Sequence, residues 1–360
     1  MTTTTSTSIH RPERPATGAA MPATTPTIDA TTNTTGRMRA IIQRGYGSVE
    51  VLQAAEVAVP MIEDDEVLIE VRAAGLDRGT WHLMAGYPYA VRLATGLRTP
   101  RRAVVGIDVA GIVVGVGSKV HRFQIGDEVF GVGKGTFAER TVAKEAKLAM
   151  KPPTLSFEQA AAIPVSGLTA LQAMDVGRVQ AGQHVLVIGA SGGVGTYAVQ
   201  LAKALGATVT GVSSTAKLDL VRAVGADHVI DYSLDDFAAG RQRYDVILDI
   251  GGNASLSRLR RALTTTGTLV IVGGEDGGRW TGMGRQLRAL ALSPLVRQRL
   301  RTMMAKEHHT GLERLAELVA AGSLTPAIER SYPLNESASA MRHLVSGNVR
   351  GKLVISVGPF

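Results

Sequence analysis

A run of glycines between a buried strand and an amphipathic helix constrains the fold of this 360-residue chain more than any other feature. An apolar strand predicted at 184–188 leads into the run, and apolar side chains then recur at helical spacing from Val194 to Leu205. Glycine permits the tight turn and the close backbone approach that this junction needs. The pattern predicts a strand–turn–helix unit of a parallel sheet. The turn consists of Gly189, Ala190, Ser191, Gly192, Gly193, Val194 and Gly195.

The same turn has the properties of a pyrophosphate site. The first amide groups of a helix have no partner within the helix, and the positive end of the helix dipole favours a negative ligand. Glycines that serve only to turn the chain are the alternative interpretation. The strand before the motif and the amphipathic helix after it favour a dinucleotide.

The end of the next strand, predicted at 208–212, distinguishes between two dinucleotides. An NAD site usually has an acid there, which accepts from the ribose 2′-hydroxyl. Here Ser213, Ser214 and Lys217 follow the strand, and no acid occurs before Asp219. Hydroxyls and a lysine suit a 2′-phosphate, and Tyr232 is placed to close the same pocket. We therefore expect NADPH rather than NADH, with Lys217 as a merely solvated helix residue as the alternative.

The rest of the chain divides into two kinds of pattern. Short strands separated by glycine-rich turns predict an all-β module at 39–43, 66–72, 108–116, 127–132 and 136–143. From residue 156 onward, helices alternate with strands, which predicts an α/β domain with a doubly wound parallel sheet. We expect a disordered tail at 1–36, a catalytic domain at 38–159 and 300–360, and a cofactor-binding domain at 160–299.

The tail and a basic segment stand apart from these patterns. Residues 1–36 hold few large apolar side chains and several prolines, which favours disorder over a transit peptide. Residues 279–306 contain six Arg and one Lys without an acid and are helical in character. A solvated helix with an apolar underside is the favoured interpretation, and a helix on a partner subunit or over the cleft is the alternative.

Composition excludes several classes of function. The chain has no cysteine, which excludes disulfides, a catalytic thiol and thiolate metal sites. Its net charge is +8, but the basic segment lacks the aromatic series that nucleic-acid binding uses. No apolar run is long enough for a membrane span.

Five motifs in order make residues 38–358 resemble the medium-chain dehydrogenase/reductase superfamily, in its zinc-free quinone oxidoreductase branch. They are GIDVAG at 106–111, GDEVFG at 126–131, AAAIPVSGLTA at 160–170, the glycine turn at 189–195, and GADHVIDY at 225–232. The resemblance implies a GroES-like β-barrel domain interrupted by a Rossmann domain. It also implies a homodimer and NADPH-dependent reduction of quinones or α,β-unsaturated carbonyls.

The resemblance includes departures that affect the metal. Zinc-dependent members have Gly-His-Glu where this chain has Gly106, Ile107 and Asp108, and a catalytic Cys near the position of Asp77. Both ligand positions are lost, so we expect no metal. Zinc-free relatives often have Asn at the Asp77 position. Without a Lewis acid, conjugate reduction is favoured over plain alcohol oxidation.

Several further residues are candidates for the site. Tyr46 is expected to donate to the substrate oxygen or to stack near the nicotinamide, with a partly exposed turn tyrosine as the alternative. The resemblance places Thr169 at the nicotinamide and Lys352 near the phosphates, although Lys352 also suits the start of an edge strand. Strand ends should contact the nicotinamide ribose through Ile250, Gly251, Val272 and Gly273, and a loop should form the apolar substrate wall through Trp81, Tyr87 and Tyr89.

The sequence thus predicts a cytoplasmic oxidoreductase that acts on a small molecule and binds no nucleic acid. The alternatives are a zinc-free NAD(P)-dependent alcohol or carbonyl dehydrogenase, and a non-catalytic NADPH-binding or interaction protein.

Overall fold

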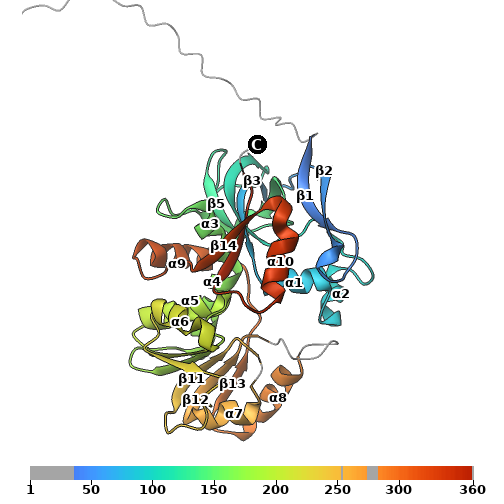
Figure 1. The fold of residues 1–360 in the computed structure, drawn as a ribbon. Coiled ribbons are helices and arrows are strands. Elements are labelled where there is room, and N and C mark those ends of the chain that lie inside the picture. Colours follow the sequence, from blue (N-terminus) through green and yellow to red (C-terminus); the bar gives the residue numbers. More distant parts are fainter. Residues whose placement is uncertain (1–35, 253, 274–282, 359–360) are drawn as a thin grey trace, which may run out of the picture. The chain divides into compact units, whose positions relative to one another are not determined.

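The computed structural model of this protein describes residues 36–252, 254–273 and 283–358. Most strands in these ranges belong to one largely antiparallel sheet or to one parallel sheet (Figure 1). A separate ribbon pairs β1 (Arg37–Gln43) with β2 (Leu52–Ala58). The tail predicted at 1–36 lies, apart from Gly36, outside the described residues.

The largely antiparallel sheet contains strands from both the early and the late part of the chain. Its order is β14-β15-β3-β4-β5-β7, and β6 also pairs with β3. The late strand β15 runs antiparallel to β3, with Leu353 opposite Leu76. The all-β module predicted from the closely spaced strands is present. The bounds are β3 (Glu66–Leu76), β4 (Asp108–Val116), β5 (Glu128–Val132), β6 (Arg140–Lys144), β7 (Leu148–Met150), β14 (Ile328–Pro333) and β15 (Lys352–Ser356).

The parallel sheet has the order β10-β9-β8-β11-β12-β13. The order reverses between β8 and β11, which makes the carboxyl ends of these two strands the place where a doubly wound sheet binds ligands. The predicted α/β alternation is confirmed. The bounds are β8 (His184–Ile188), β9 (Thr208–Ser213), β10 (His228–Asp231), β11 (Tyr244–Asp249), β12 (Leu263–Ile271) and β13 (Arg299–Thr302).

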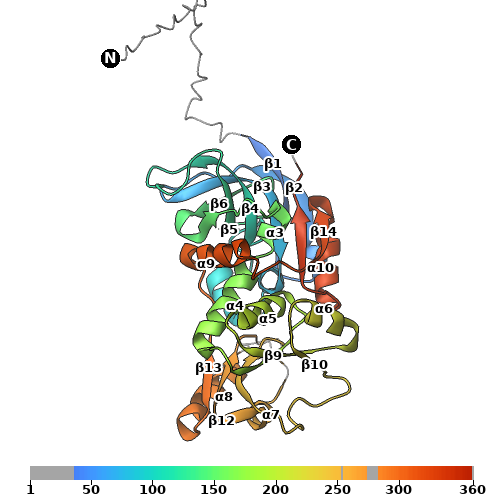
Figure 2. The same cartoon turned by 90° about the vertical axis from the view of Figure 1, so that its left-hand side faces the viewer.

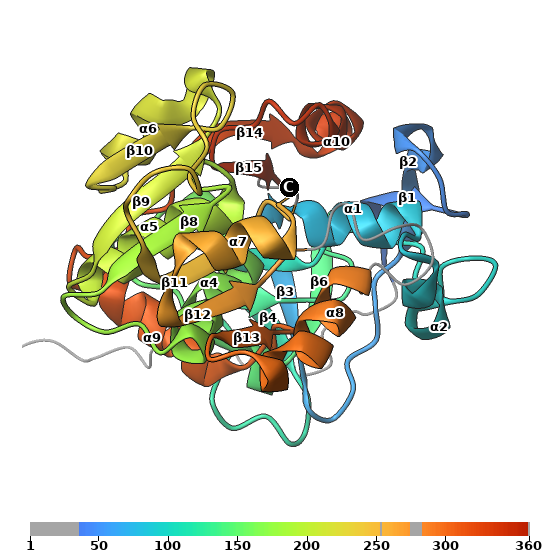
Figure 3. The same cartoon turned by 90° about the horizontal axis from the view of Figure 1, so that it is seen from below.

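Alternate residues of each strand pack on opposite faces of the parallel sheet. In β8, Val185 and Val187 contact the core under α4 and α5, whereas Leu186 contacts the core under α7 and α8. Helices α7 and α8, labelled in Figure 3, cover the face of the sheet that carries Leu186. The helices are α4 (Pro164–Gly177), α5 (Gly193–Ala204), α7 (Leu256–Ala262) and α8 (Gly284–Leu292).

The two sheets are joined by a continuous apolar core. One buried cluster runs from Phe130 of β5 through Leu168 and Leu171 of α4 to Leu248 of β11 in the parallel sheet. Figure 2 shows α4 and α5 between the two sheets. The remaining helices are α1 (Arg78–Ala85), α2 (Arg92–Thr95), α3 (Phe157–Ala161), α6 (Leu218–Ala223), α9 (His309–Ala320) and α10 (Ser337–Val345).

The structure corrects three expectations about elements. Residues 299–302 form strand β13, so the helical character predicted for the whole basic segment is wrong there, and the parallel sheet extends past the boundary predicted at 299. Trp81 lies on helix α1 and not in a loop. Helix α8 has the predicted apolar underside in Ala289 and Leu292, which pack against the core under α7, whereas Leu287 and Leu290 are exposed. Arg279 of the basic segment lies outside the described residues.

Within the residues that the structure describes, no helix combines the length and the apolar character that crossing a bilayer requires.

Candidate functional site

A cavity of about 470 Å³ lies at the carboxyl ends of β8, β11 and β12. The parallel sheet contributes the glycine turn and the strand ends Ile250, Gly251, Val272 and Gly273. The start of α1, the start of α4 and residues from 344–352 form the rest of the wall. The cavity therefore occupies the place where a doubly wound sheet binds its ligand.

The glycine turn brings the N-terminus of α5 to this cavity. Gly189 has a φ of +84°, a conformation that side chains rarely adopt. A Cβ atom on Gly195 would lie 2.1 Å from the carbonyl oxygen of Gly189, so the helix and the turn pack too closely for any side chain there. Helix α5 begins at Gly193, which lines the cavity. The backbone thus forms a cradle whose first amide groups are available to an anion.

The structure separates the residues of this turn into two groups. Ala190 and Gly195 are buried beneath the turn and do not line the cavity. The others line it, and they are Gly189, Ser191, Gly192, Gly193 and Val194.

Lys217 is the polar side chain at the outer end of the cavity. It belongs to a short turn after β9 and donates from Nζ to the carbonyl oxygens of Gly347 (2.6 Å) and Val349 (2.9 Å). Partial burial lowers the pKa of its ammonium group below the ordinary value. Asp77 is the only carboxylate among the residues that line the cavity, and it comes from the other sheet.

The other residues predicted for this end lie around Lys217 and do not line the cavity. Ser213 is buried and donates to the hydroxyl of Ser191 at 2.7 Å. Ser214 is half-buried at the start of the turn. Tyr232 is 61% exposed, so the predicted closing of the pocket by its ring is not seen.

Arg350 is a residue that the sequence analysis missed. Its guanidinium donates to the carbonyl oxygen of Ala216 (2.9 Å) and to the carboxylate of Asp219 (2.6 Å). It therefore connects the turn that carries Lys217 to the segment before β15, with its charge balanced by Asp219. No local pattern reveals this, because the two segments are far apart in the sequence and meet only when the sheets assemble.

A buried cluster of charged groups forms the inner end of the cavity. Lys352 Nζ lies 3.1 Å from Ser166 Oγ, 3.4 Å from Asp108 Oδ2 and 3.8 Å from Asp77 Oδ2. Asp108 Oδ1 accepts from the backbone N–H of Val165 at 3.0 Å. Burial raises the pKa of the Asp108 carboxyl, Lys352 opposes this rise and Asp77 adds to it, and together these effects bring the pKa to about 8.

Lys352 also contacts the glycine turn. The resemblance implied only that Lys352 lies near the phosphates. A Cβ atom on Gly193 would lie 2.9 Å from the Lys352 side chain. The backbone N–H of Gly351 donates to the carbonyl oxygen of Ser191 at 2.8 Å. Thr169 lines the cavity from α4, and its hydroxyl donates to the carbonyl oxygen of Val165 at 2.7 Å.

Tyr46 does not reach this cavity. Its hydroxyl donates to the carbonyl oxygen of Gly96 at 2.7 Å and lies 2.8 Å from the hydroxyl of Thr95. The guanidinium of Arg92 lies over its ring at 4.5 Å. These contacts hold the loop after α2, so the structure does not support the expected catalytic role of Tyr46.

The aromatic residues predicted as a substrate wall also lie away from the cavity. Arg92 stacks on Tyr89 (4.8 Å) and Tyr87 (5.7 Å) as well, and the two rings contact each other at 5.1 Å. Trp81 packs edge-to-face on His82. Of these aromatic and imidazole rings, only that of His82 belongs to a residue lining the cavity.

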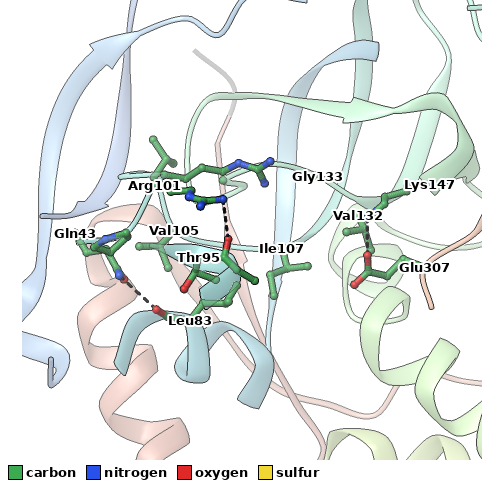
Figure 4. A pocket seen from close by; sticks show the side chains of 16 residues that line it. Gln43, Leu83, Thr95, Arg101, Val105, Ile107, Val132, Gly133, Lys147 and Glu307 are labelled. Carbon is green, nitrogen blue, oxygen red and sulfur yellow. Dashed lines mark hydrogen bonds and ion pairs between the residues drawn. The ribbon is translucent and has the colours of Figure 1, made fainter. Parts of the chain in front are cut away.

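Figure 4 shows the residues that line a second cavity of about 390 Å³. Ile107 lines this second cavity, and Gly79 lines the first. A Cβ atom on Gly79 would lie 3.6 Å from the Cδ1 atom of Ile107, so the two cavities are neighbours. Arg101 is at the edge of the second cavity and donates to the carbonyl oxygen of Ala94 at 3.4 Å. On the opposite side, Lys147 and Glu307 form an ion pair at 2.6 Å (Figure 4).

Two family models match the chain. One is described as the alcohol dehydrogenase GroES-like domain and matches residues 63–154. The other is described as zinc-binding dehydrogenase and matches residues 224–355. Together with the strand order of the parallel sheet, they confirm the predicted combination of a GroES-like domain and a Rossmann domain.

Known proteins resemble the chain over most of its length. The mitochondrial NAD(P)H oxidoreductase RTN4IP1 of Mus musculus is 35% identical over 87% of this chain and 87% of its own length. The 2-methylene-furan-3-one reductase of Solanum lycopersicum is 32% identical over 88% of this chain and 79% of its own length. The solved structure of the quinone oxidoreductase from Coxiella burnetii has a TM-score of 0.79 and 31% identity over 90% of this chain and all of that chain.

The residues at the site do not fit a zinc ion. Ile107 offers no donor atom, and Asp77 Oδ1 already accepts from the N–H of Thr80 at 3.0 Å. Among the described residues, no three His, Cys, Asp or Glu side chains are grouped so that they could hold a metal. The site offers no ligand set of the kind that structural or catalytic zinc requires.

Proposed function

Because this chain belongs to the quinone oxidoreductase-like family of medium-chain dehydrogenases/reductases, and is therefore an oxidoreductase with a nicotinamide cofactor, we propose that it uses NADPH to reduce quinones or the C=C bond of α,β-unsaturated carbonyls. The observation that carries the proposal is the single cavity that combines the glycine turn, the strand ends and the buried Lys352 cluster. The names of the relatives support the substrate class, since they include a quinone oxidoreductase and a 2-methylene-furan-3-one reductase.

The cavity residues fit a dinucleotide. The cradle at Gly189 and Gly195 has no room for a Cβ atom, and the N-terminus of α5 faces the same space. We therefore assign the pyrophosphate to this turn. The strand ends at Ile250 and Val272 line the path from the turn toward Thr169, where we assign the nicotinamide.

The preference for NADPH rests on the charges around Lys217. Lys217 belongs to the turn after β9 and lines the cavity, and among the described residues no carboxylate lines the cavity at this end. Arg350 binds the same turn at Ala216, with its charge balanced by Asp219. Asp231, the acid at the end of β10, already accepts hydrogen bonds from Thr215 and from Ser233. A ribose 2′-hydroxyl would thus lack its usual carboxylate acceptor, whereas a 2′-phosphate would find positive charge.

The cofactor supplies a hydride when it is bound, and the chain's own residues bind and orient the substrate. We place the substrate between the two cavities, near Ile107 and the start of α1. Lys352 lines the first cavity, and we assign its ammonium group to stabilising an oxygen that gains negative charge. Zinc-dependent members of the family have a metal ligand at the position of Ile107, which is apolar. A substrate whose own carbonyl group withdraws charge therefore fits the site, because it does not need a metal to polarise it.

The proposal includes a homodimer in the cytoplasm. Strand β13 is at the edge of the parallel sheet, and an edge strand leaves backbone groups available for pairing with a second copy. Light scattering on the purified protein is expected to give twice the mass of one chain. A mass of one chain would remove the dimer from the proposal without affecting the chemistry.

A panel of electron acceptors tests the proposed reaction. Purified protein is mixed with NADPH and, in separate assays, with a quinone, an enone and a simple aldehyde, and NADPH absorbance is followed. Oxidation of NADPH with the quinone or the enone is the expected result. Turnover of the aldehyde alone would instead support a carbonyl dehydrogenase, and binding of NADPH without any turnover would support a non-catalytic binder.

A further inference from the structure

The second cavity has an apolar lining next to the place proposed for the reacting group. Apolar side chains of the segment before β4 and of β5 contribute to it, among them Val104, Val105 and Val132. Val105 and Val132 are buried, with exposures of 6% and 5%. The volume of about 390 Å³ is of the size that holds small organic molecules. The cavity therefore has the room and the surface for a part of the substrate beyond its reacting group.

Positive charge dominates the polar part of this lining. Among the described residues, three cationic side chains and one carboxylate line the cavity, and they are Arg101, Arg102, Lys147 and Glu307. Lys147 and Glu307 pair with each other at 2.6 Å, so each balances the charge of the other. Figure 4 shows this pair on one side, Arg101 on the other and Ile107 between them. The charges of Arg101 and Arg102 remain without a balancing acid in the lining.

The two arginines keep hydrogen-bond donors for a ligand. Both residues are exposed, and no carboxylate in the described part of the chain forms an ion pair with either of them. The Arg101 guanidinium donates to the carbonyl oxygen of Ala94 at 3.4 Å, which is long for a charged donor. A guanidinium has five N–H groups, so most of those of Arg101 are available to an anion at the edge of the cavity.

The segment that carries these arginines is basic as a whole. Residues 78–107 contain five Arg and neither Asp nor Glu. Arg92 stacks on three tyrosine rings, and Arg98 is exposed. A cavity wall that has one sign of charge raises the local concentration of ligands of the opposite sign. The segment therefore favours an anionic ligand over a neutral one.

The backbone that carries the two arginines is held on both sides. The backbone N–H of Arg101 donates to the carbonyl oxygen of Thr95 at 2.7 Å, and the backbone N–H of Gln43 in β1 donates to the carbonyl oxygen of Ala103 at 2.8 Å. The hydroxyl of Tyr46 lies 2.8 Å from that of Thr95. A backbone that is already ordered has less conformational freedom to lose when a ligand binds.

The two cavities are placed so that one substrate can reach both. The contact between Ile107 and Gly79 joins their linings. Thr169, where the nicotinamide is assigned, lines the first cavity. A substrate whose reacting double bond lies near Thr169 can therefore extend its other end past Ile107 toward Arg101.

We propose that the second cavity binds the distal part of the substrate, and that Arg101 and Arg102 select acceptors with an anionic group, a carboxylate or a phosphate, at the end of an apolar body. The inference rests on the proposed function and narrows its substrate class. Guanidinium groups match the oxygens of both anions. The contact is far from the reacting atoms and is the same before and during hydride transfer. It therefore lowers KM and leaves kcat nearly unchanged.

Matched acceptors test the selection. The acceptor that the panel shows to be reduced is prepared with one apolar chain that ends in a carboxylate, in a phosphonate or in a neutral methyl ester. For the unmodified protein, kcat/KM of at least one anion is expected to exceed that of the ester by roughly 10-fold or more, through KM. The better anion identifies which of the two groups the site prefers. Equal values for the three forms, or a preference for the ester, would overturn the proposal.

Arg101→Gln combined with Arg102→Gln assigns the preference to these side chains. The ratio of kcat/KM for the anion to that for the ester is expected to fall by roughly 10-fold. Arg98→Gln is the matched control, because Arg98 belongs to the same segment, is exposed and lines neither cavity. It should leave the ratio within about twofold of the original. An unchanged ratio in the double variant, or an equal fall for the anion and the ester, would overturn the proposal.

The dependence on salt needs no variant. Exposed charges are screened by ions, so added salt should raise the KM of the anionic acceptor at saturating NADPH and change that of the ester much less. The same dependence for both acceptors would overturn the proposal.

A binding measurement separates this inference from the proposed reaction. A saturated keto acid and its methyl ester are titrated into the protein by calorimetry, without NADPH. Tighter binding of the acid, lost in the double Arg101 and Arg102 variant, is the expected result. Equal binding of acid and ester, or acid binding that the double variant retains, would overturn the inference alone. A panel in which no acceptor is reduced would instead overturn the proposed function.

Discussion

At the scale of single residues, the role of each candidate site residue depends on where its side chain lies and not on its residue type alone. Lys217 and Lys352 both line the cavity, yet one lies at its outer end beside Arg350 and the other is buried between two carboxyls. Tyr46 has a hydroxyl suited to catalysis, but its contacts with Thr95 and Gly96 occupy it elsewhere.

The glycine turn was predictable from the sequence because its effects are local. A positive φ at Gly189 and the close approach at Gly195 depend on residues a few positions away. The cluster of Asp77, Asp108 and Lys352 depends on strand register between distant segments, which a single sequence does not reveal. For the same reason Arg350 was missed and Tyr87 was wrongly expected at the cavity.

Lys217→Ala tests the proposed 2′-phosphate contact. Removal of one charge-assisted hydrogen bond should weaken NADPH binding by roughly 10- to 100-fold and NADH binding much less. Fluorescence titration with each cofactor measures both constants. Lys203→Ala is the control, because Lys203 pairs with Asp227 and does not line the cavity. Equal losses for the two cofactors would exclude Lys217 from the phosphate contact.

Asp108→Asn tests through stability whether the buried Asp108 carboxyl keeps its proton in the folded state. The folded protein holds this proton up to a pKa of about 8, far above the ordinary value of 3.8. The folded state thus binds more protons than the unfolded state between these values, and its stability from this group is lost as the pH rises through them. Relative to the variant, the unmodified protein should lose about 1 kcal/mol of unfolding free energy per pH unit in this window. Urea denaturation at pH 5 to 8 measures the difference, and parallel pH curves would contradict the prediction.

At the scale of elements, a continuous apolar run was a reliable guide to a strand that is central and buried on both faces. Strand β8 has the predicted bounds. It pairs with β9 on one side and β11 on the other, so its register and length are fixed from both sides. Strand β13 was missed because it is a short edge strand rich in arginine, although the exposed Arg299 and Arg301 flank a buried Leu300. Helix α1 has local signals for both ends, since Asp77 caps its start and Gly86 follows its last residue. The helix was still missed, because it is too short for an apolar pattern at helical spacing to be recognised.

The contact between α8 and the end of β11 gives a prediction at this scale. Arg285 pairs with the fully buried carboxylate of Asp249 and donates to the carbonyl oxygen of Gly252. Arg285→Ala would leave that carboxylate buried without its partner, which should lower the unfolding free energy by about 3 kcal/mol or more.

The loss in Arg285→Ala should grow with pH. Burial raises the pKa of Asp249 and Arg285 opposes the rise, so without Arg285 the carboxyl must be ionised at greater cost as the pH increases. Thermal denaturation at pH 5 and pH 8 measures this. Arg314→Ala, which breaks an exposed pair with Asp175, should change stability by less than about 1 kcal/mol at both pH values. A deficit in Arg285→Ala no larger than this would contradict the account.

At the scale of the whole molecule, the site depends on segments from both sheets. The parallel sheet provides the glycine turn, and the largely antiparallel sheet provides Asp77, Asp108 and Lys352. Strand β15 connects them, because it pairs with β3 while Gly351 bonds to Ser191 of the turn. The two fold types were predictable from their different periodicities, but their mutual placement depends on these long-range contacts.

The most direct test of the proposed reaction is the destination of the hydride. NADPH carrying deuterium at both C4 positions is given to the protein with an enone, and the product is examined by NMR. We predict one deuterium at the β-carbon of the saturated product. Deuterium at the carbonyl carbon, or none in the product, would contradict the account.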